Sequence, residues 1–331
     1  MVVDHAPLLG HEEALQAVRR MRLQQCLPHA LLLTGPDGVG KTTFALTVAA
    51  DLACDDLQSD GGHCGVCRGC TLALAGSHPD ILRIAPPKEE TTIGQMRELR
   101  YVANLAPNLS SRRVIVIEKA ETLNDQAANA ILKVLEDAPD HLLLMALAPS
   151  CQSVLPTIES RSIEIPLKPV ERIRLADFLR LQGVESGEAD TLSAYSGGVP
   201  GRAISLSKNP ELVALLARIG AWVNKLSESP LGFALKLAEE LGDIADLAKK
   251  YIRIDDTSED PAAVSDRQAI GWTLDALMAA FQSSFDHSQP KWEPEQTAKM
   301  AGEVNRTRRL ILSYAAADLQ LERLVIRLLQ S

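Results

Sequence analysis

One short segment constrains the fold of this 331-residue chain more than any other. The apolar run Ala30–Thr34 leads into Gly35-Pro-Asp-Gly-Val-Gly40-Lys41-Thr42, which fits G-x-x-x-x-G-K-[ST], and a helical pattern follows. In this order of strand, loop and helix, the glycines let consecutive backbone amides turn toward a phosphate chain, and the helix amino terminus adds partial positive charge. The segment predicts a phosphate-binding loop; the alternative is a loop that has kept this shape and binds nothing.

The residues after the loop decide between binding and hydrolysis of a nucleotide. In such loops the lysine, here Lys41, neutralises the β- and γ-phosphates, and Thr42 ligates Mg²⁺. An acidic residue that helps to ligate Mg²⁺ is expected after the apolar run 114–117, and Glu118 stands at that place. Lys119 stands where a water-polarising carboxylate belongs, and Glu121 lies too far along to replace it, so we expect very slow hydrolysis. The residues expected to bind ATP with Mg²⁺ are Gly35, Gly38, Gly40, Lys41, Thr42, Thr43 and Glu118.

The wider hydrophobic pattern predicts an α/β domain followed by helices. Short apolar runs at 30–34, 80–84, 114–117, 142–147 and 162–166 alternate with helical patterns at 41–52, 93–105 and 125–137, which indicates a parallel sheet covered by helices on both faces. After residue 166 only helical patterns remain, at 171–181, 188–195, 201–207 and throughout 210–331. The final helix of the chain is expected to be a single long helix that begins at about Glu295.

Charge and hydropathy exclude several classes of protein. With 34 basic and 43 acidic side chains the formal charge is −9, which argues against a protein that coats nucleic acid generally. Eight of the acids lie within 239–260 and are interpreted as a solvated helix face and loop. No apolar run approaches the roughly 20 residues of a membrane-spanning helix, and the amino terminus lacks a signal-peptide pattern. We therefore expect a cytoplasmic protein without a membrane partner.

Four of the six cysteines have the spacing of a metal site. Cys54, Cys64, Cys67 and Cys70 form C-x₉-C-x₂-C-x₂-C in a glycine-rich segment, which suits a structural, tetrahedral Zn²⁺. An iron–sulfur cluster is the chemical alternative, although the C-x₃-C-P continuation of ferredoxins is missing. His63 is interpreted as a bystander beside the cluster. Cys26 and Cys151 have no partner at metal spacing and are read as ordinary small residues.

Three features together resemble one family. A phosphate loop precedes a four-cysteine module, the stretch 129–139 (NAILKVLEDAP) is similar to the N-A-L-L-K-x-L-E-E-P-P helix of clamp-loader ATPases, and 157–162 (TIESRS) is similar to their S-R-C element with Ser162 in place of cysteine. The chain thus resembles subunits of bacterial DNA polymerase III clamp loaders, which are AAA+ proteins. The motifs cover about the first 208 residues. The resemblance implies a RecA-like AAA+ P-loop domain at 1–166 with the zinc module at 54–70, a three-helix lid at 167–208, and an all-helical collar for oligomerisation at 209–331.

The resemblance also implies roles for two arginines. Arg161 corresponds to an arginine finger that reaches into the ATP site of an adjacent motor subunit, and Arg202 lies at the position of a nucleotide-sensing arginine in the lid. The implied partners are ATPase motor subunits and a delta subunit in a hetero-pentamer, which loads a sliding clamp onto primer–template DNA during replication. The chain would belong to the DNA polymerase holoenzyme without being a polymerase itself.

Departures from the motor pattern favour a stator over an ATPase. Glu118-Lys119 replaces Asp-Glu, and Ala148-Pro149 follows the fourth apolar run without a polar sensor residue. Two alternatives remain: an autonomous clamp-loader ATPase motor, and a zinc-dependent nucleic-acid-binding module, although the cysteine segment has little basic or aromatic character for the second. Candidate DNA contacts in an assembled ring are Arg97, Arg100, Arg112, Arg113 and Lys133.

Overall fold

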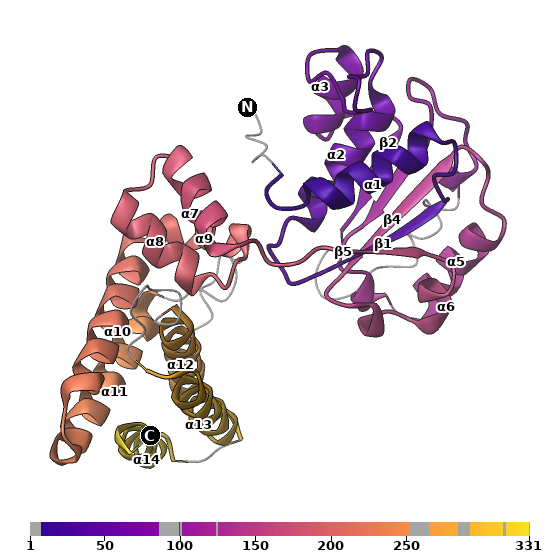
Figure 1. The fold of residues 1–331 in the computed structure, drawn as a ribbon. Coiled ribbons are helices and arrows are strands. Elements are labelled where there is room, and N and C mark those ends of the chain that lie inside the picture. Colours follow the sequence, from indigo (N-terminus) through magenta and orange to yellow (C-terminus); the bar gives the residue numbers. More distant parts are fainter. Residues whose placement is uncertain are drawn as a thin grey trace. The chain divides into compact units, whose positions relative to one another are not determined.

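The computed structural model divides the chain into two compact units, Met1–Val170 and Glu171–Ser331 (Figure 1). The structure describes residues 8–85, 99, 101–123, 125–251, 265–283, 292–313 and 316–330. The helix expected at 93–105 therefore lies mostly outside the described residues, as do Arg97, Arg100 and the end of the acidic window at 252–260. Within the described residues, no helix is long and apolar enough to cross a membrane.

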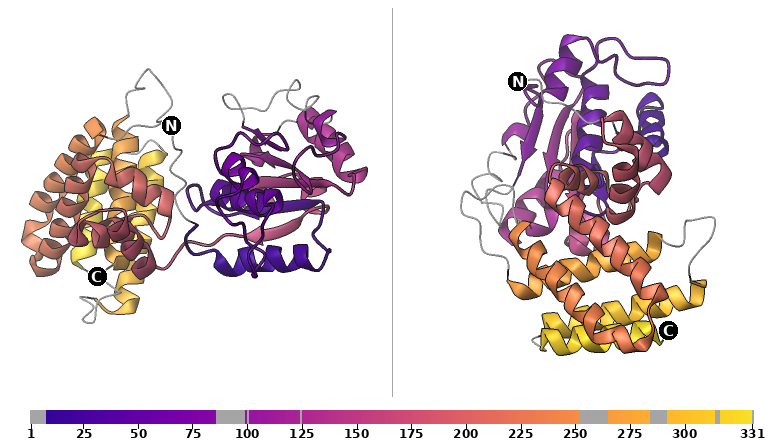
Figure 2. Two further views of the ribbon diagram at one scale, coloured as in Figure 1. Left: turned by 90° about the horizontal axis from the view of Figure 1, so that it is seen from above. Right: turned by 90° about the vertical axis from the view of Figure 1, so that its left-hand side faces the viewer.

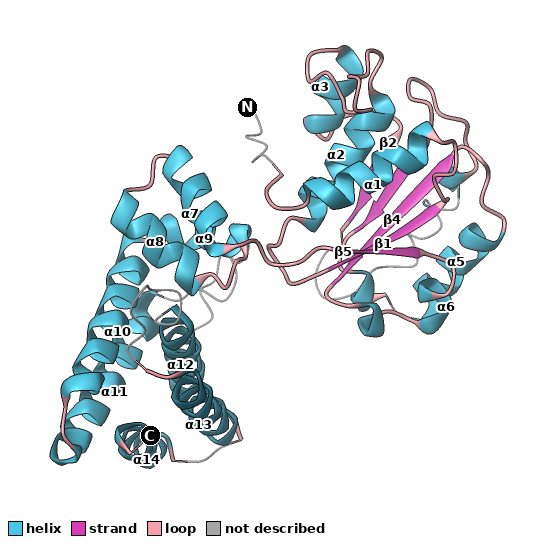
Figure 3. Ribbon diagram, in the orientation of Figure 1, coloured by secondary structure: helices cyan, strands magenta, loops and turns pink. Residues whose placement is uncertain are grey.

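The first unit is built on a five-stranded parallel sheet with the order β2-β3-β4-β1-β5 (Figure 3). All five predicted strands are confirmed to within one residue at each end, and β1, β3 and β4 are buried along their whole length. Burial on both faces explains why these strands read as continuous apolar runs instead of alternating ones. The strands are β1 (Ala30–Thr34), β2 (Ile81–Ile84), β3 (Arg113–Ile117), β4 (Leu142–Ala148) and β5 (Ile163–Pro166).

Helices cover both faces of this sheet because side chains alternate between the faces along each strand. Leu31 and Leu33 pack in one core with α1 and α2, whereas Leu32 packs in a second core with α5. Helix α1 was not expected from the sequence; Leu15 and Val18 are its only buried residues, and half of the others are charged. The helices are α1 (Glu12–Leu23), α2 (Lys41–Ala53), α3 (Arg68–Leu74), α5 (Asp125–Glu136) and α6 (Pro156–Glu159), with 3₁₀ turns η1 (Ala120–Thr122) and η2 (Cys151–Ser153).

In its described residues, the second unit consists of helices and the loops between them, without strands (Figure 2). Helix α8 packs against α7 and α9 and also against α10 and α12. The boundary expected at residue 208 thus lies inside this unit, and the division into lid and collar stays a prediction. The elements are α7 (Arg172–Leu181), α8 (Ser186–Tyr195), α9 (Pro200–Ser207), α10 (Pro210–Glu228), η3 (Leu231–Phe233), α11 (Ala234–Tyr251), α12 (Asp266–Ser283), α13 (Pro294–Leu312) and α14 (Ala317–Leu329).

The expected single long helix at the carboxyl end is wrong. Helix α13 ends at Leu312, and α14 begins at Ala317 after Ala316, whose backbone is extended with φ −62° and ψ 117°. The break lets α13 pack on α12 while α14 packs on α11. A continuous helix could not bury both apolar stripes against these two neighbours, so packing overrides the local helical pattern.

Candidate functional site

The predicted phosphate loop lies at the carboxyl edge of the sheet, where ligands of parallel α/β sheets bind. Its amide at Gly35 donates to the carbonyl oxygens of Ala148 and Pro149, both at 3.2 Å, so the end of β4 supports the loop. Gly35, Gly38 and Gly40 have φ values of +148°, +81° and +111°. These left-handed conformations require glycine. A Cβ on Gly35 would also lie 2.3 Å from the carbonyl oxygen of Leu167.

Lys41 is directed toward the carbonyl oxygens of its own loop. Its Nζ donates to the carbonyl oxygens of Gly35 at 2.6 Å and Pro36 at 3.2 Å, and to the Asp37 carboxylate at 3.2 Å. The Lys41 side chain is only 10% exposed. A bound phosphate would have to replace these oxygens. Thr42 and Thr43 lie in the first turn of α2, half-buried, at the positive end of the helix.

Glu118, the acid expected to ligate Mg²⁺, is already paired with an arginine. Glu118, directly after β3, accepts hydrogen bonds on one carboxylate oxygen from Nε of Arg83 at 3.0 Å and Nη2 at 2.5 Å. The next residue, Lys119, has φ +51°, an uncommon left-handed conformation for a residue with a side chain. Glu121 turns away into η1, where its Oε2 is buried without a hydrogen-bond partner among the described residues. The structure therefore brings Glu118 to the same edge as the loop, but with its charge already neutralised.

Arg161 lies at the amino ends of the strands, opposite the carboxyl ends where the phosphate loop lies. It precedes β5, which runs parallel to β1 with Ile163 opposite Leu31. The phosphate loop follows the far end of β1, four residues beyond that pair, which corresponds to roughly 13 Å of strand. Arg161 therefore lies at the opposite end of the strands from the phosphate loop of its own domain. The guanidinium is 38% exposed and donates to Glu136 at 2.9 Å.

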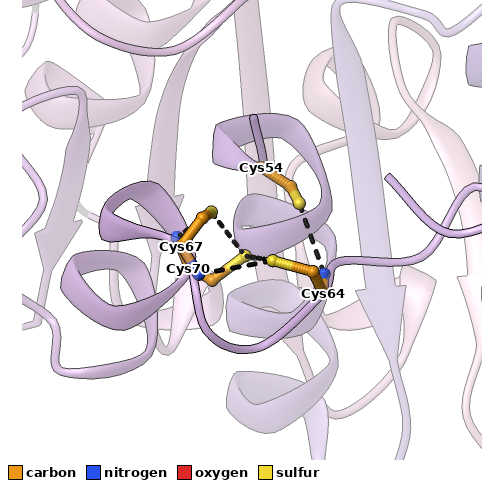
Figure 4. A group of neighbouring side chains, drawn as sticks. All are labelled: Cys54, Cys64, Cys67 and Cys70. Carbon is orange, nitrogen blue, oxygen red and sulfur yellow. Dashed lines mark hydrogen bonds between the residues drawn. The ribbon is translucent and has the colours of Figure 1, made fainter. Parts of the chain in front are cut away.

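The four predicted cysteine ligands converge on one point (Figure 4). All four sulfur atoms lie within 4.8 Å of one another, with Cys64 and Cys70 at 3.9 Å and Cys67 and Cys70 at 3.3 Å. Four sulfurs at about 2.3 Å from a single tetrahedral ion are spaced by about 3.8 Å, so the geometry is compatible with structural zinc. The cluster leaves room for one ion and not for several irons.

Local backbone donors prepare these sulfurs for metal binding. The Cys70 amide donates to the sulfur of Cys67, which caps α3, and this contact lowers the pKa of Cys67 to about 6. Burial instead raises the pKa of Cys54 and Cys70. The thiolate is the form that binds metal. Cys67 is thus the cysteine whose contacts most favour the thiolate.

The sequence analysis missed a polar network beside the cysteines. Asp51 on α2 is buried and accepts hydrogen bonds from Nε of Arg19 at 2.7 Å and from the amide and Nδ1 of His63 at 2.9 and 2.7 Å. Arg19 also binds Asp60 at 2.7 Å. Burial raises the pKa of Asp51, but these partners outweigh it and the net shift is downward. His63 is outside the metal group, as interpreted from the sequence, but its contacts with Asp51 hold the residue next to Cys64 on α2. Spacing could not reveal contacts between residues so far apart in the chain.

The candidate basic residues have different environments. The expectation that Arg113 contacts DNA is wrong, because it is 4% exposed and donates to the carbonyl oxygens of Leu105 at 2.9 Å and Ala106 at 2.8 Å. Arg112 is half-buried, whereas Lys133 is exposed on α5. Arg202 is exposed in the first turn of α9, in the second unit.

Comparison with known proteins places this geometry in a family. Residues 10–171 match the family model described as DNA polymerase III, delta subunit. DNA polymerase III subunit delta' of Pseudomonas aeruginosa is 38% identical over 177 residues, which cover 52% of this chain and 53% of that protein. Over residues 10–171, the chain belongs to the clamp-loader AAA+ family. The recognition made from the phosphate loop, the cysteines, the 129–139 helix motif and the 157–162 element is confirmed.

Two further relatives define how far the likeness extends. Subunit delta' of Escherichia coli is 34% identical over 184 residues, or 54% of each chain. DNA polymerase III subunit gamma/tau of Mycobacterium tuberculosis is 33% identical over 167 residues, which are 49% of this chain and 28% of that protein. The chain spans about half the length of the curated delta' relatives it matches. The family model ends at residue 171, at the boundary between the two units.

Proposed function

We propose that this chain is a delta' stator subunit of a DNA polymerase III clamp loader that donates Arg161 in trans to the ATP site of a neighbouring motor subunit. The observation that carries the proposal is the position of Arg161 at the amino end of β5, across the sheet from the chain's own phosphate loop. An arginine there cannot serve its own nucleotide. It is half-exposed and can serve another subunit's nucleotide.

The chain's own loop supports a stator over a motor. Lys41 is satisfied by loop oxygens, Glu118 is paired with Arg83, and Lys119 stands where an acid would polarise water. ATP with Mg²⁺ would be held by the glycines of the loop, Lys41, Thr42, Thr43 and Glu118, and sensed by Arg202. Nucleotide bound in this way would have no base to activate water, so hydrolysis would be very slow.

Zinc is the proposed ion of the cysteine cluster. Cys54, Cys64, Cys67 and Cys70 would hold it as a closed site without an open position for a substrate, so its contribution is structural. The ion would fix the segment 54–70, which otherwise has few buried apolar residues. Asp51 and Arg19 would hold this segment against α1 and α2.

The proposed partners are ATPase motor subunits and a delta subunit in a hetero-pentamer. In this assembly residues 167–208 act as lid and 209–331 as collar, and the ring loads a sliding clamp onto primer–template DNA. A cytoplasmic replication protein fits this role. An arginine finger supplied in trans accelerates phosphoryl transfer by about 10³–10⁵.

The test is the ATPase activity of the reconstituted complex. We expect Arg161→Ala to leave assembly intact, as followed by gel filtration, and to reduce DNA-stimulated hydrolysis by at least tenfold. Arg180→Ala is the matched control, since Arg180 is a third exposed and ion-paired but lies on α7. Normal ATPase activity of the Arg161→Ala complex would refute the finger. Rapid hydrolysis by the isolated chain would instead support the motor alternative.

A further inference from the structure

Glu136 and Arg161 come from segments 25 residues apart and meet at the edge of the sheet opposite the phosphate loop. Helix α5 ends at Glu136, and the short helix α6 precedes Arg161. Burial of Ile158, at 1% exposure, fixes α6 on the core. The backbone of Arg161 is fixed as well, because its amide donates to the carbonyl oxygen of Ile158 at 3.2 Å.

The Arg161 side chain is oriented by three acceptors. Nη2 donates to Oε1 of Glu136 at 2.9 Å, and Nη1 donates to the carbonyl oxygen of Thr157 at 3.3 Å and to Oγ of Ser160 at 3.5 Å. Only the Glu136 contact is both short and charge-assisted, which makes it the strongest of the three. The Glu136 side chain is 53% exposed, so the pair is accessible to a partner subunit.

A free arginine side chain has many rotamers, and ordering it at the moment of phosphate contact costs free energy. A carboxylate that holds Nη2 in advance restricts the guanidinium to a few orientations. The guanidinium still has other N–H donors, on Nε and on the terminal nitrogens, to offer to the oxygens of a phosphate. An acceptor at this place therefore prepares the finger without occupying all of it.

We propose that Glu136 is a positioning residue for Arg161, holding the guanidinium ready for the neighbouring subunit's γ-phosphate. The proposal rests on the trans role of Arg161 given above. It assigns a function to the last glutamate of the 129–136 helix motif, to which the family resemblance attached none here. Because the pair is exposed, its contribution is that of a surface ion pair, roughly two- to fivefold in rate.

The experiment measures ATP hydrolysis by the reconstituted complex with Glu136→Ala, Glu136→Gln and Glu136→Asp in this chain. We expect Glu136→Ala to lower kcat two- to fivefold with KM for ATP unchanged, since the nucleotide is bound by the neighbour. Glu136→Gln keeps an acceptor oxygen and is expected to recover part of the loss. Glu159→Ala is the matched control, since Glu159 is exposed on α6 and has no ion pair in the described part of the chain.

A double-mutant cycle separates positioning from a merely structural role. If Glu136 acts through Arg161, adding Glu136→Ala to Arg161→Ala has no further effect on kcat. Additive losses, or a lowered unfolding temperature for Glu136→Ala that accounts for the change, would overturn the proposal. An unchanged kcat for Glu136→Ala beside a large loss for Arg161→Ala would refute the role of Glu136 alone. No effect of Arg161→Ala would refute the finger itself.

Discussion

Asp80 is expected to be the most costly single charge to remove from the first unit. It lies directly before β2, fully buried, and accepts hydrogen bonds from the backbone amides of Asn108 at 2.7 Å, Leu109 at 2.7 Å and Ser110 at 2.9 Å. Oγ of Ser110 adds a fourth at 3.1 Å, and Nη2 of Arg113 lies 3.3 Å away. One carboxylate thus ties the loop before β3 to the start of β2.

The perturbation is Asp80→Asn, which keeps the shape but leaves one acceptor oxygen and no charge. Buried amides lose their acceptor, and Arg113 loses its counter-ion while it keeps carbonyl partners. Hydrogen bonds to a charged group contribute about 1.5–3 kcal/mol each, but bonds that share one carboxylate are not additive. Breaking a buried pair costs about 3–5 kcal/mol, and we expect the free energy of unfolding of this unit to fall by that amount.

The effect must also depend on pH with a definite sign. Burial by itself raises the pKa of Asp80, but the three amides and the Ser110 hydroxyl outweigh it and lower the pKa below its ordinary value. The stabilisation is therefore complete above the unfolded-state pKa of about 3.9. It is lost as the pH falls through the depressed folded-state pKa. The gap between wild type and Asp80→Asn should be constant at neutral pH and close in acid.

The assay must report the first unit alone. Trp222, Trp272 and Trp292 are the three tryptophans, and all lie in the second unit. Hydrogen exchange of peptides covering 108–117, measured against urea, follows the first unit while tryptophan fluorescence follows the second. Asp140→Asn is the control, since Asp140 is exposed in the loop before β4. A loss below about 1 kcal/mol, or a gap that does not shrink as the pH is lowered through the acid range, would refute this reasoning.

Two further predictions concern the cysteine cluster. The purified chain should contain one zinc ion, as measured by plasma emission spectrometry. Cys64→Ser should lose the ion and lower the unfolding temperature of the first unit, whereas the control Cys26→Ser should keep its metal content. Iron with visible absorbance would contradict the zinc assignment. Gly69→Ala should also lose the metal and lower the unfolding temperature, because its Cβ would lie 1.8 Å from the carbonyl oxygen of Ala53. The control Gly187→Ala should be neutral, since a Cβ there meets nothing within 4 Å. An unchanged unfolding temperature for Gly69→Ala would contradict the close packing of α3 on α2.

Some site residues could be predicted from the sequence because their signals are local. The phosphate loop requires glycines, a lysine and a threonine at fixed offsets, and the cysteines require only that close spacing in the chain becomes close spacing in space. Contacts between distant segments have no such signal. Asp51 with His63, Arg83 with Glu118, and Arg161 with Glu136 each needed the packed structure.

By itself, the sequence determined the identity of the elements: five strands, the glycine-rich loop after the first, and the four cysteines that the fold brings together. The tertiary structure decided where these elements face. The parallel pairing of β5 with β1 places Arg161 at the amino ends of the strands, whereas the chain's own phosphate loop lies at their carboxyl ends. Packing within the first unit buries Arg113, and packing within the second unit separates α13 from α14. Periodicity depends on a residue's near neighbours, whereas strand order, burial and ion pairs depend on segments that meet only when the cores close.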